Sequence, residues 1–198
     1  MTETKKMFEK HMGLKIINFI DSGYADYISA RTLINTNQLI QGCILANTAL
    51  EKYFKAFMLF KGDNVKKIHV LNKLTPSVFN FDHKLKKVIN EEFINLLTLA
   101  YLYRYYDDLI SGYNLAIIKR KVLAEIDYIV SELEPKIKFS SSELNKKTTK
   151  YDNDVQQKNS LLFQNNYILN NINKDNFIEN GPDVVNCTPV SRQFFNTI

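Results

Sequence analysis

Apolar residues recur at three- and four-residue steps along most of the first 134 residues, which is the period of an amphipathic helix. The clearest case begins at Gly42, and its apolar stripe consists of Ala46, Ala49, Leu50, Tyr53, Phe57 and Phe60. The small residues in this stripe allow a neighbouring helix to approach closely. Gly62 is placed to end the helix in the left-handed conformation that only glycine adopts at little cost. We expect the opposite side, with Asn47, Thr48, Glu51, Lys52 and Lys55, to face water.

The same pattern predicts five further helical segments. They cover about residues 2–20, 24–37, 69–74, 90–108 and 113–134. Breaks are expected at Asp21–Gly23, Pro76, Ser111-Gly112 and Pro135. Asn90 is a good N-cap, and the two glutamates that follow it complement the helix dipole. No strand alternation is sustained, so residues 1–139 are predicted to form an all-α antiparallel up-and-down bundle of four to five helices.

The character of the chain changes after Phe139. Residues 140–159 are mostly polar and read as a linker, and asparagine makes up 12 of the 59 residues from 140 to 198. The segment is nevertheless too apolar for a solvated tail, so it either folds back on the helical core or docks on a partner. We predict a C-terminal appendage over 140–198, with one short helix near 160–172 and irregular structure beyond Gly181.

Composition excludes several classes of protein. An apolar fraction of 45% is ordinary for a globular chain, and no apolar stretch is long enough to predict a membrane span. The polar N-terminus leads into no apolar region, so no secretory signal is expected. Cys43 and Cys187 suggest no disulfide framework, which favours a cytoplasmic location. The three histidines show no metal-ligand spacing with the cysteines, and no glycine-rich phosphate loop occurs, so neither metal nor cofactor is predicted.

The basic excess is unevenly distributed. Residues 1–139 carry 20 Lys+Arg and 15 Asp+Glu, whereas residues 140–198 carry 6 of each, so the formal charge of +5 belongs to the first part. Lys66-Lys67 and the run from Lys84 to Lys87 form small clusters. This balance is compatible with RNA or another polyanion, and also with a mildly basic soluble surface.

Three short elements follow one another in a specific order. They are the run Ala49-Leu-Glu-Lys-Tyr-Phe-Lys-Ala56 with Gly62 after it, the element His69-Val-Leu71, and the step Arg104-Tyr105. This ordered set resembles the HEPN domain family over about residues 23–134. The resemblance implies an antiparallel bundle of four or five helices that is often a homodimer. It also raises the question of ribonuclease activity, because many members cut RNA with an arginine and a histidine four to six residues apart.

The chain departs from that catalytic pair. Arg104 lies where the arginine is expected, but the last histidine of the chain is His83, so none follows. We therefore predict no catalytic residues, and candidate ligand-binding residues at Arg104, Tyr105, Tyr106, Asp107 and His69. The arginine and tyrosines are suited to hold phosphate and stack on bases, although packing and an ion pair to Asp107 are an equally ordinary use of them. His69 either lines a cleft beside Arg104 or serves as a simple hydrogen-bonding residue at a helix start.

Three functions remain open from the sequence. The first is a non-catalytic, dimeric HEPN-like binding module for RNA, a nucleotide or a partner protein. The second is a toxin-type HEPN ribonuclease with a departed active site around Arg104. The third is the HEPN partner of a nucleotidyltransferase in a toxin–antitoxin pair. The missing histidine favours a protein that is not an enzyme, without deciding the point.

Overall fold

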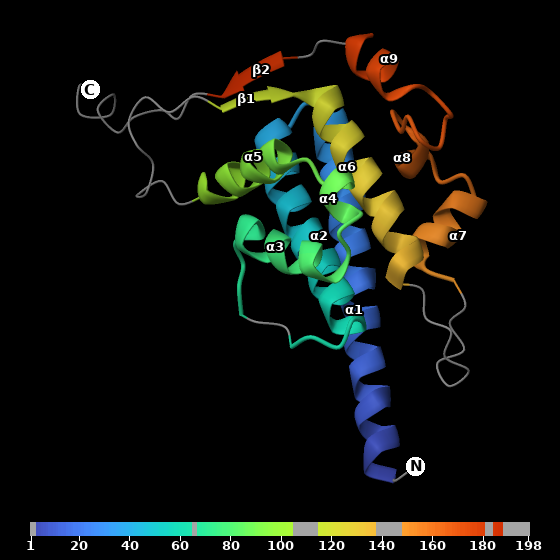
Figure 1. The fold of residues 1–198 in the computed structure, drawn as a ribbon. Helices are drawn as coiled ribbons and strands as arrows, with labels where there is room; N and C mark the ends of the chain where they lie inside the picture. The colour runs from blue at the N-terminus through green and yellow to red at the C-terminus, as the bar shows by residue number, and fades with distance from the viewer. Residues whose placement is uncertain (1–2, 65–66, 105–114, 138–147, 181–183, 188–198) are drawn as a thin grey trace, which may run out of the picture.

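The structure is a computed structural model that describes residues 3–64, 67–104, 115–137, 148–180 and 184–187, with the side chains of 3–10 and 184–187 outside the description. Most of it is helical, which confirms the predicted all-α bundle (Figure 1). The elements in order are α1 (Glu3–Asn35), α2 (Leu39–Phe60), α3 (Leu71–Phe81), α4 (Leu85–Val88), α5 (Glu91–Leu102), β1 (Leu115–Ile118), α6 (Lys119–Leu133), the 3-10 helix η2 (Glu134–Ile137), α7 (Lys150–Gln156), α8 (Ser160–Phe163), α9 (Lys174–Glu179) and β2 (Val184–Cys187). None of the described helices is both long and apolar enough to cross a bilayer.

Helices α1 and α2 form an antiparallel hairpin around which the rest is built (Figure 1). The break predicted at Asp21–Gly23 is wrong, because α1 runs without interruption through it. A Cβ on Gly23 would lie 3.2 Å from the Cβ of Lys52, and one on Gly42 would lie 2.5 Å from Cγ1 of Ile34. The two glycines therefore permit close helix contact, and this packing outweighs the helix propensity that glycine lacks, about 1 kcal/mol.

Helix α2 occupies the centre of the bundle, with α1, α3, α5 and α6 all packed against it. Its predicted apolar stripe is buried from Ala46 to Phe57, while Phe60 is 37% exposed. Gly62 has φ of 86°, and its amide donates to the carbonyl of Leu59 at 2.9 Å, so it ends the helix as predicted.

Two predicted boundaries fail in the stretch that follows. Pro76 lies inside α3 instead of ending it, because Leu71, Leu74 and Val78 bury one face of the helix while Pro76 is on the exposed side. There the carbonyl that lacks its helical donor can bond to water. Asn90 caps α5 as predicted, accepting from the amide of Glu92 at 2.9 Å. The helix ends at Leu102, however, before Arg104 and well short of Asp108.

A short antiparallel sheet was not predicted. Residues Leu115–Ile118 form β1 where the sequence predicts the start of a helix, and they pair with β2 where it predicts irregular structure. Leu115 faces Cys187 and Ile118 faces Val184 in the register. The buried side chains of β1 alternate, with Leu115 and Ile117 inward, which is the period of a strand. Over four residues this alternation is too short to separate from a buried helical turn.

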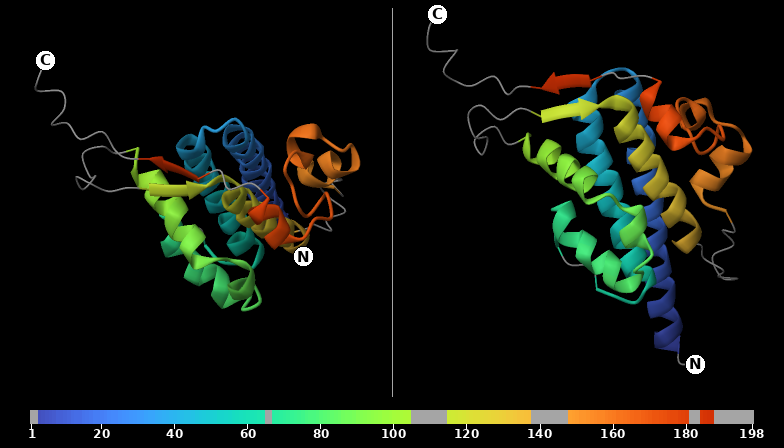
Figure 2. Two further views of the ribbon diagram at one scale, coloured as in Figure 1. Left: turned by 90° about the horizontal axis from the view of Figure 1, so that it is seen from above. Right: turned by 45° about the horizontal axis from the view of Figure 1, so that its top comes forward.

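The C-terminal segment packs on the helical core over residues 148–180. Helices α7, α8 and α9 lie along α1 and α6, on the opposite side of the bundle from α3 and α5 (Figure 2). Helix α7 begins within the predicted linker, where Thr149 and Asp152 form a capping box. Leu162 and Phe177 are buried against the core, and Lys174 pairs with Glu125 at 2.8 Å. Of the two accounts of this segment, the described residues therefore show the first.

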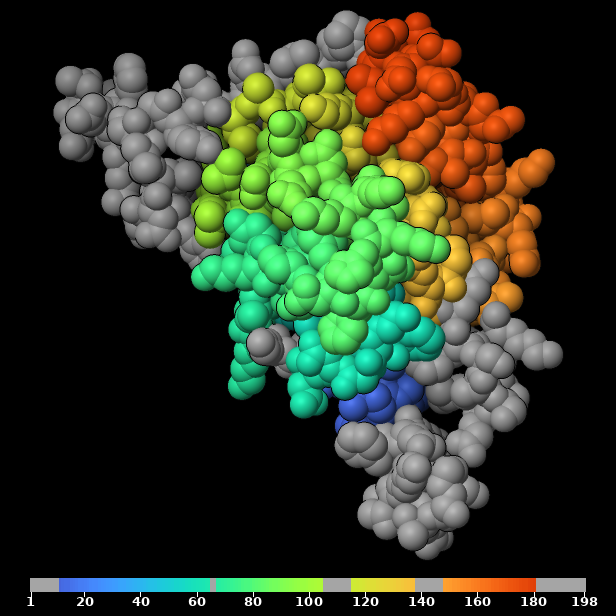
Figure 3. All heavy atoms as spheres, in the orientation of Figure 1, coloured from blue at the N-terminus to red at the C-terminus, as the bar shows by residue number. Residues whose placement is uncertain are grey.

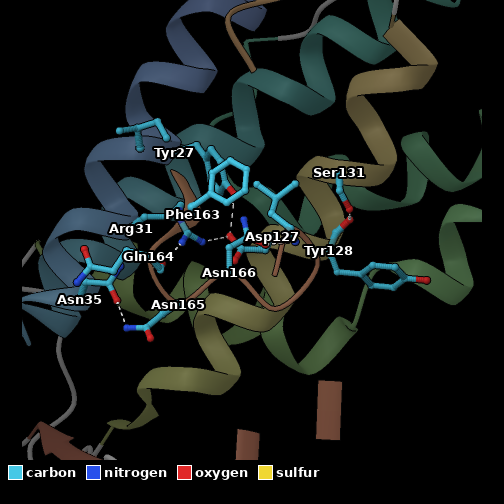
Figure 4. A network of polar contacts seen from close by, with 12 residues as sticks. Tyr27, Arg31, Asn35, Asp127, Tyr128, Ser131, Phe163, Gln164, Asn165 and Asn166 are labelled. Atoms are coloured by element: carbon cyan, nitrogen blue, oxygen red, sulfur yellow. Dashed lines mark hydrogen bonds and ion pairs between the residues drawn. The ribbon is translucent and has the colours of Figure 1, made fainter. Parts of the chain in front are cut away.

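One buried arginine joins α1, α6 and this segment (Figure 4). The side chain of Arg31 is 0% exposed and forms an ion pair with Asp127 of α6, which also accepts from the hydroxyl of Tyr27 at 2.7 Å. Two further guanidinium nitrogens donate to main-chain carbonyls of the C-terminal segment. Nε donates to Leu161 at 3.3 Å, and Nη2 donates to Gln164. Burial alone would lower the pKa of Arg31, but Asp127 and Tyr27 outweigh it and raise the pKa above its ordinary value.

We predict that Arg31→Met lowers the free energy of unfolding by about 3–5 kcal/mol, because it leaves Asp127 as an uncompensated buried charge. Denaturant unfolding of the full chain measures this. The control is Lys15→Met, which removes an exposed cation from the same helix and should change stability by less than about 0.5 kcal/mol. Equal stability of the Arg31→Met variant and the unmodified chain would contradict the role assigned to Arg31.

Candidate functional site

Residues 64–90 hold the basic charge of the chain. This segment contains six lysines and one aspartate, a formal net charge of +5, while the other residues carry 20 Lys+Arg and 20 Asp+Glu and are neutral in sum. Its described part forms the centre of the face seen in Figure 3, in teal to green. The five described lysines of the segment are all exposed: Lys67, Lys73, Lys84, Lys86 and Lys87. The segment therefore presents an excess of positive charge to solvent, with Asp63, Glu91 and Glu92 flanking it in the sequence.

The single acid of this segment is already paired. Asp82, which follows α3, accepts from Lys136 of η2 at 2.9 Å, and its main-chain neighbour Lys84 donates an amide to it at 2.9 Å. The hydrogen bond from Lys136 holds the pKa of Asp82 below its ordinary value; burial opposes this shift, and the amide of Lys84 adds a smaller contribution to it. Lys136 lies outside the segment, so its pairing with Asp82 leaves the six lysines of the segment without an acidic neighbour in their own stretch of chain.

His69 lies in the basic segment just before α3, and its ring contacts a buried ion pair of α2. Its Nδ1 lies 3.0 Å from Oε1 of Glu51, and the same oxygen accepts from Nζ of Lys55 at 2.6 Å. Glu51 and Lys55 are buried, with side chains 9% and 6% exposed, whereas the side chain of His69 is 65% exposed. A buried ion pair on α2 thus fixes an exposed imidazole.

The buried positions of Glu51 and Lys55 correct a prediction. Together with Asn47 they were expected on the wet side of α2, yet all three are buried in the structure. The reason is the central place of α2, which other helices cover on nearly every side. The amide of Asn47 is fully enclosed and has no hydrogen-bond partner in the part of the chain that the structure describes.

Arg104 lies in a turn just beyond α5 and not on a helix face. Its amide donates to the carbonyl of Tyr101 at 3.4 Å, and its Nε donates to the same carbonyl at 3.3 Å, which satisfies an end of the helix. The guanidinium carbon lies 3.8 Å from the centre of the Tyr101 ring, so the cation stacks on the aromatic face. Arg104 itself is exposed. Tyr105, Tyr106 and Asp107 lie outside the described residues.

The predicted site residues thus fall on two elements of the bundle. His69 precedes α3 and contacts α2, whereas Arg104 follows α5 and contacts Tyr101; α3 and α5 pack against each other. Two features escaped sequence reasoning: the Glu51 partner of His69, and the extent of the basic segment. A count of charged residues in windows of about 25 residues would have found the basic segment. A count over residues 1–139 as a whole averages that segment with acidic stretches.

Metal binding finds no support in the described ranges, where no group of three or more His, Cys, Asp or Glu side chains is placed to hold an ion. Cys43 is buried in α2. The chemistry that the described face offers is therefore that of lysines, an arginine on a tyrosine ring and an oriented imidazole.

Fold and site together define an all-α bundle with a basic face. A family model described as the HEPN domain matches residues 18–133, more than half of the chain. The chain belongs to the HEPN domain family. No curated protein and no solved structure matched it. The matched region ends at α6, so the docked segment with α7 to α9 lies beyond the part that the family model covers.

The Asp82–Lys136 pair generates a pH prediction. Since Lys136 lowers the pKa of Asp82 in the folded chain, the pair stabilises the fold above the ordinary pKa of 3.8 and loses its effect as the pH falls through the lower folded value. Asp82→Asn should therefore cost up to about 1 kcal/mol at pH 7, because the pair is partly exposed, and nothing at pH 2. Chemical denaturation from pH 2 to pH 7 measures the difference.

Lys136→Met is the matched partner for this measurement. It removes the same pair, so adding Asp82→Asn to it should change the pH dependence of stability only by the smaller contribution of the Lys84 amide. A cost of Asp82→Asn that is the same at pH 2 and pH 7 would contradict the assignment.

Proposed function

We propose that this chain is a non-catalytic RNA-binding module of the HEPN family. The observation that carries the proposal is the segment 64–90, which holds a net charge equal to that of the whole chain and displays its described lysines on one exposed face. Phosphate contacts from lysine and arginine supply most of the affinity for a nucleic acid, and they need exposed cations without acidic neighbours. Asp82 and Glu51, the acids nearest to this face in the contacts described above, are both engaged by lysines.

Arg104 extends the proposed surface at the end of α5. Its guanidinium lies flat over the Tyr101 ring and is exposed, so a base of a single strand can stack on the same assembly while the cation meets a phosphate. Stacking on an aromatic or guanidinium plane tolerates any base sequence. We therefore expect binding of single-stranded RNA with little sequence preference.

The proposed lack of catalysis rests on the sequence. The family's ribonucleases use an arginine and a nearby following histidine, and no histidine follows Arg104 in this chain. Without that histidine, the arginine can hold a phosphate, but the sequence offers no histidine at the family's position to move a proton. The toxin-type ribonuclease and the partner of a nucleotidyltransferase are kept as alternative outcomes.

The direct test is binding of a fluorescent single-stranded oligoribonucleotide by the full chain over a range of salt concentrations. The triple variant Lys84→Ala/Lys86→Ala/Lys87→Ala should weaken binding and reduce the slope of log affinity against log salt by about 2. The control Lys15→Ala/Lys150→Ala/Lys158→Ala removes the same charge from exposed sites outside the segment and should leave the slope within about 0.5 of the unmodified chain.

Three results would contradict the proposal. The first is no measurable binding, and the second is an equal effect of the two triple variants. The third is cleavage of the RNA that disappears with Arg104→Ala, which would establish the ribonuclease instead. Recovery of a nucleotidyltransferase with a chain that fails to bind RNA would favour the toxin–antitoxin partner.

A homodimer is the second part of the proposal. The end of α5 supports it, since Leu102 is 39% exposed next to the half-buried rings of Tyr101 and Tyr103, and such apolar surface is typical of contact sites. We expect sedimentation velocity at micromolar concentration to give the mass of two chains. Leu102→Glu should shift the population towards the monomer, and only monomer in the unmodified chain would exclude this part.

A further inference from the structure

The position of His69 allows a more specific assignment within the basic face. The carboxylate of Glu51 is paired with the Lys55 ammonium and acts as an acceptor, so the Nδ1–H of His69 is the donor in their 3.0 Å contact. That leaves Nε2 as the free ring nitrogen, on a side chain that is 65% exposed. The imidazole is therefore presented in one orientation, with one nitrogen turned to the buried pair and the other available for a ligand.

The charge behind the ring is balanced. A lone carboxylate beside His69 would repel an anion, but the Lys55 ammonium lies 2.6 Å from the same oxygen of Glu51, and both side chains are buried. The Glu51–Lys55 pair carries no net charge, so it orients the ring without strongly repelling a bound anion. This combination separates His69 from His83, which is also exposed in the basic segment.

The chain around His69 favours an anion as well. From residue 64 to residue 81 the sequence contains three lysines and His69 and no acid. Lys67 precedes the histidine by two residues, and Lys73 lies in the first turn of α3; both are exposed. An oriented imidazolium, which donates from Nε2–H when both ring nitrogens carry a proton, can hold a phosphate oxygen at a fixed place among flexible cations.

We propose that His69 binds a phosphate group as the imidazolium, donating from Nε2–H, with Glu51 as the positioning residue that aims the ring and Lys55 as the neutralising cation. The inference rests on the proposed function, since the phosphate is that of a bound RNA strand. The inference assigns one hydrogen bond to a phosphate, whereas the lysines contribute only a general electrostatic attraction. It assigns no chemical step to His69.

The experiment uses the full chain labelled with ¹⁵N and follows the imidazole nitrogens by NMR. Inorganic phosphate and a single-stranded oligoribonucleotide are added in separate titrations, with sodium chloride at matched ionic strength as the reference. We expect each to shift the Nε2 signal of His69 saturably while His83 follows the sodium chloride reference. His69→Ala should weaken oligoribonucleotide binding about tenfold, and His83→Ala less than about twofold.

Glu51→Gln tests the positioning role. It keeps the size of the side chain and removes the carboxylate, so the Nδ1–H signal of His69 should change even without a ligand, and binding should weaken by at least half the effect of His69→Ala on a logarithmic scale. Circular dichroism melting identifies variants that fail to fold, and His69→Gln, at an exposed position, is the alternative to His69→Ala.

The outcomes separate this inference from the proposed function. Saturable shifts with phosphate and no binding of RNA would overturn the proposed function and support the phosphate site. RNA binding with an unmoved His69 signal, or equal losses for His69→Ala and His83→Ala, would overturn the phosphate site and leave the proposed function standing. An unchanged Nδ1–H signal in Glu51→Gln would overturn the role of Glu51.

Discussion

The buried ion pair of Arg31 and Asp127 is the constraint on which the arrangement depends. A guanidinium enclosed in the protein has five N–H donors that need acceptors, and leaving these donors without hydrogen bonds costs several kcal/mol. Asp127 on α6 and the carbonyls of Leu161 and Gln164 in the C-terminal segment accept from three of these donors, so the acceptors come from two distant parts of the chain. The C-terminal segment therefore supplies two of the acceptors that the Arg31 guanidinium uses in the folded chain.

This constraint also decides which face remains open. The segment from 148 to 180 covers α1 and α6, and its own side chains of Leu162, Asn166 and Phe177 are buried. On the other side, α3 and α4 carry the exposed lysines, and α2 supplies the pair that holds His69 (Figures 1 and 2). One side of the bundle is thus closed by its own chain, and the basic side is left for a ligand.

Features set by nearby residues could be predicted from the sequence. Asn90 caps α5 and Gly62 ends α2 because each depends on the chemistry of one turn. Features set by distant partners could not. Gly23 continues α1 because α2 passes close to it, and Leu115–Ile118 is a strand because Val184–Cys187 pairs with it. Nothing near Arg31 in the sequence indicates that its partners lie about 100 and 130 residues away.

The same division applies to the candidate site. His69 and Arg104 could be singled out by residue type and by the family resemblance. The buried Glu51–Lys55 pair that contacts His69 could not, because the helical periodicity predicted that both side chains face water.

The central claim is that RNA binds the α3–α4 face and leaves the docked segment in place. Hydrogen exchange of the full chain with and without a single-stranded oligoribonucleotide tests it most directly. The account predicts slower exchange in residues 67–90 on binding and unchanged protection in residues 160–169. Slower exchange confined to residues 148–180, or loss of their protection on binding, would contradict it.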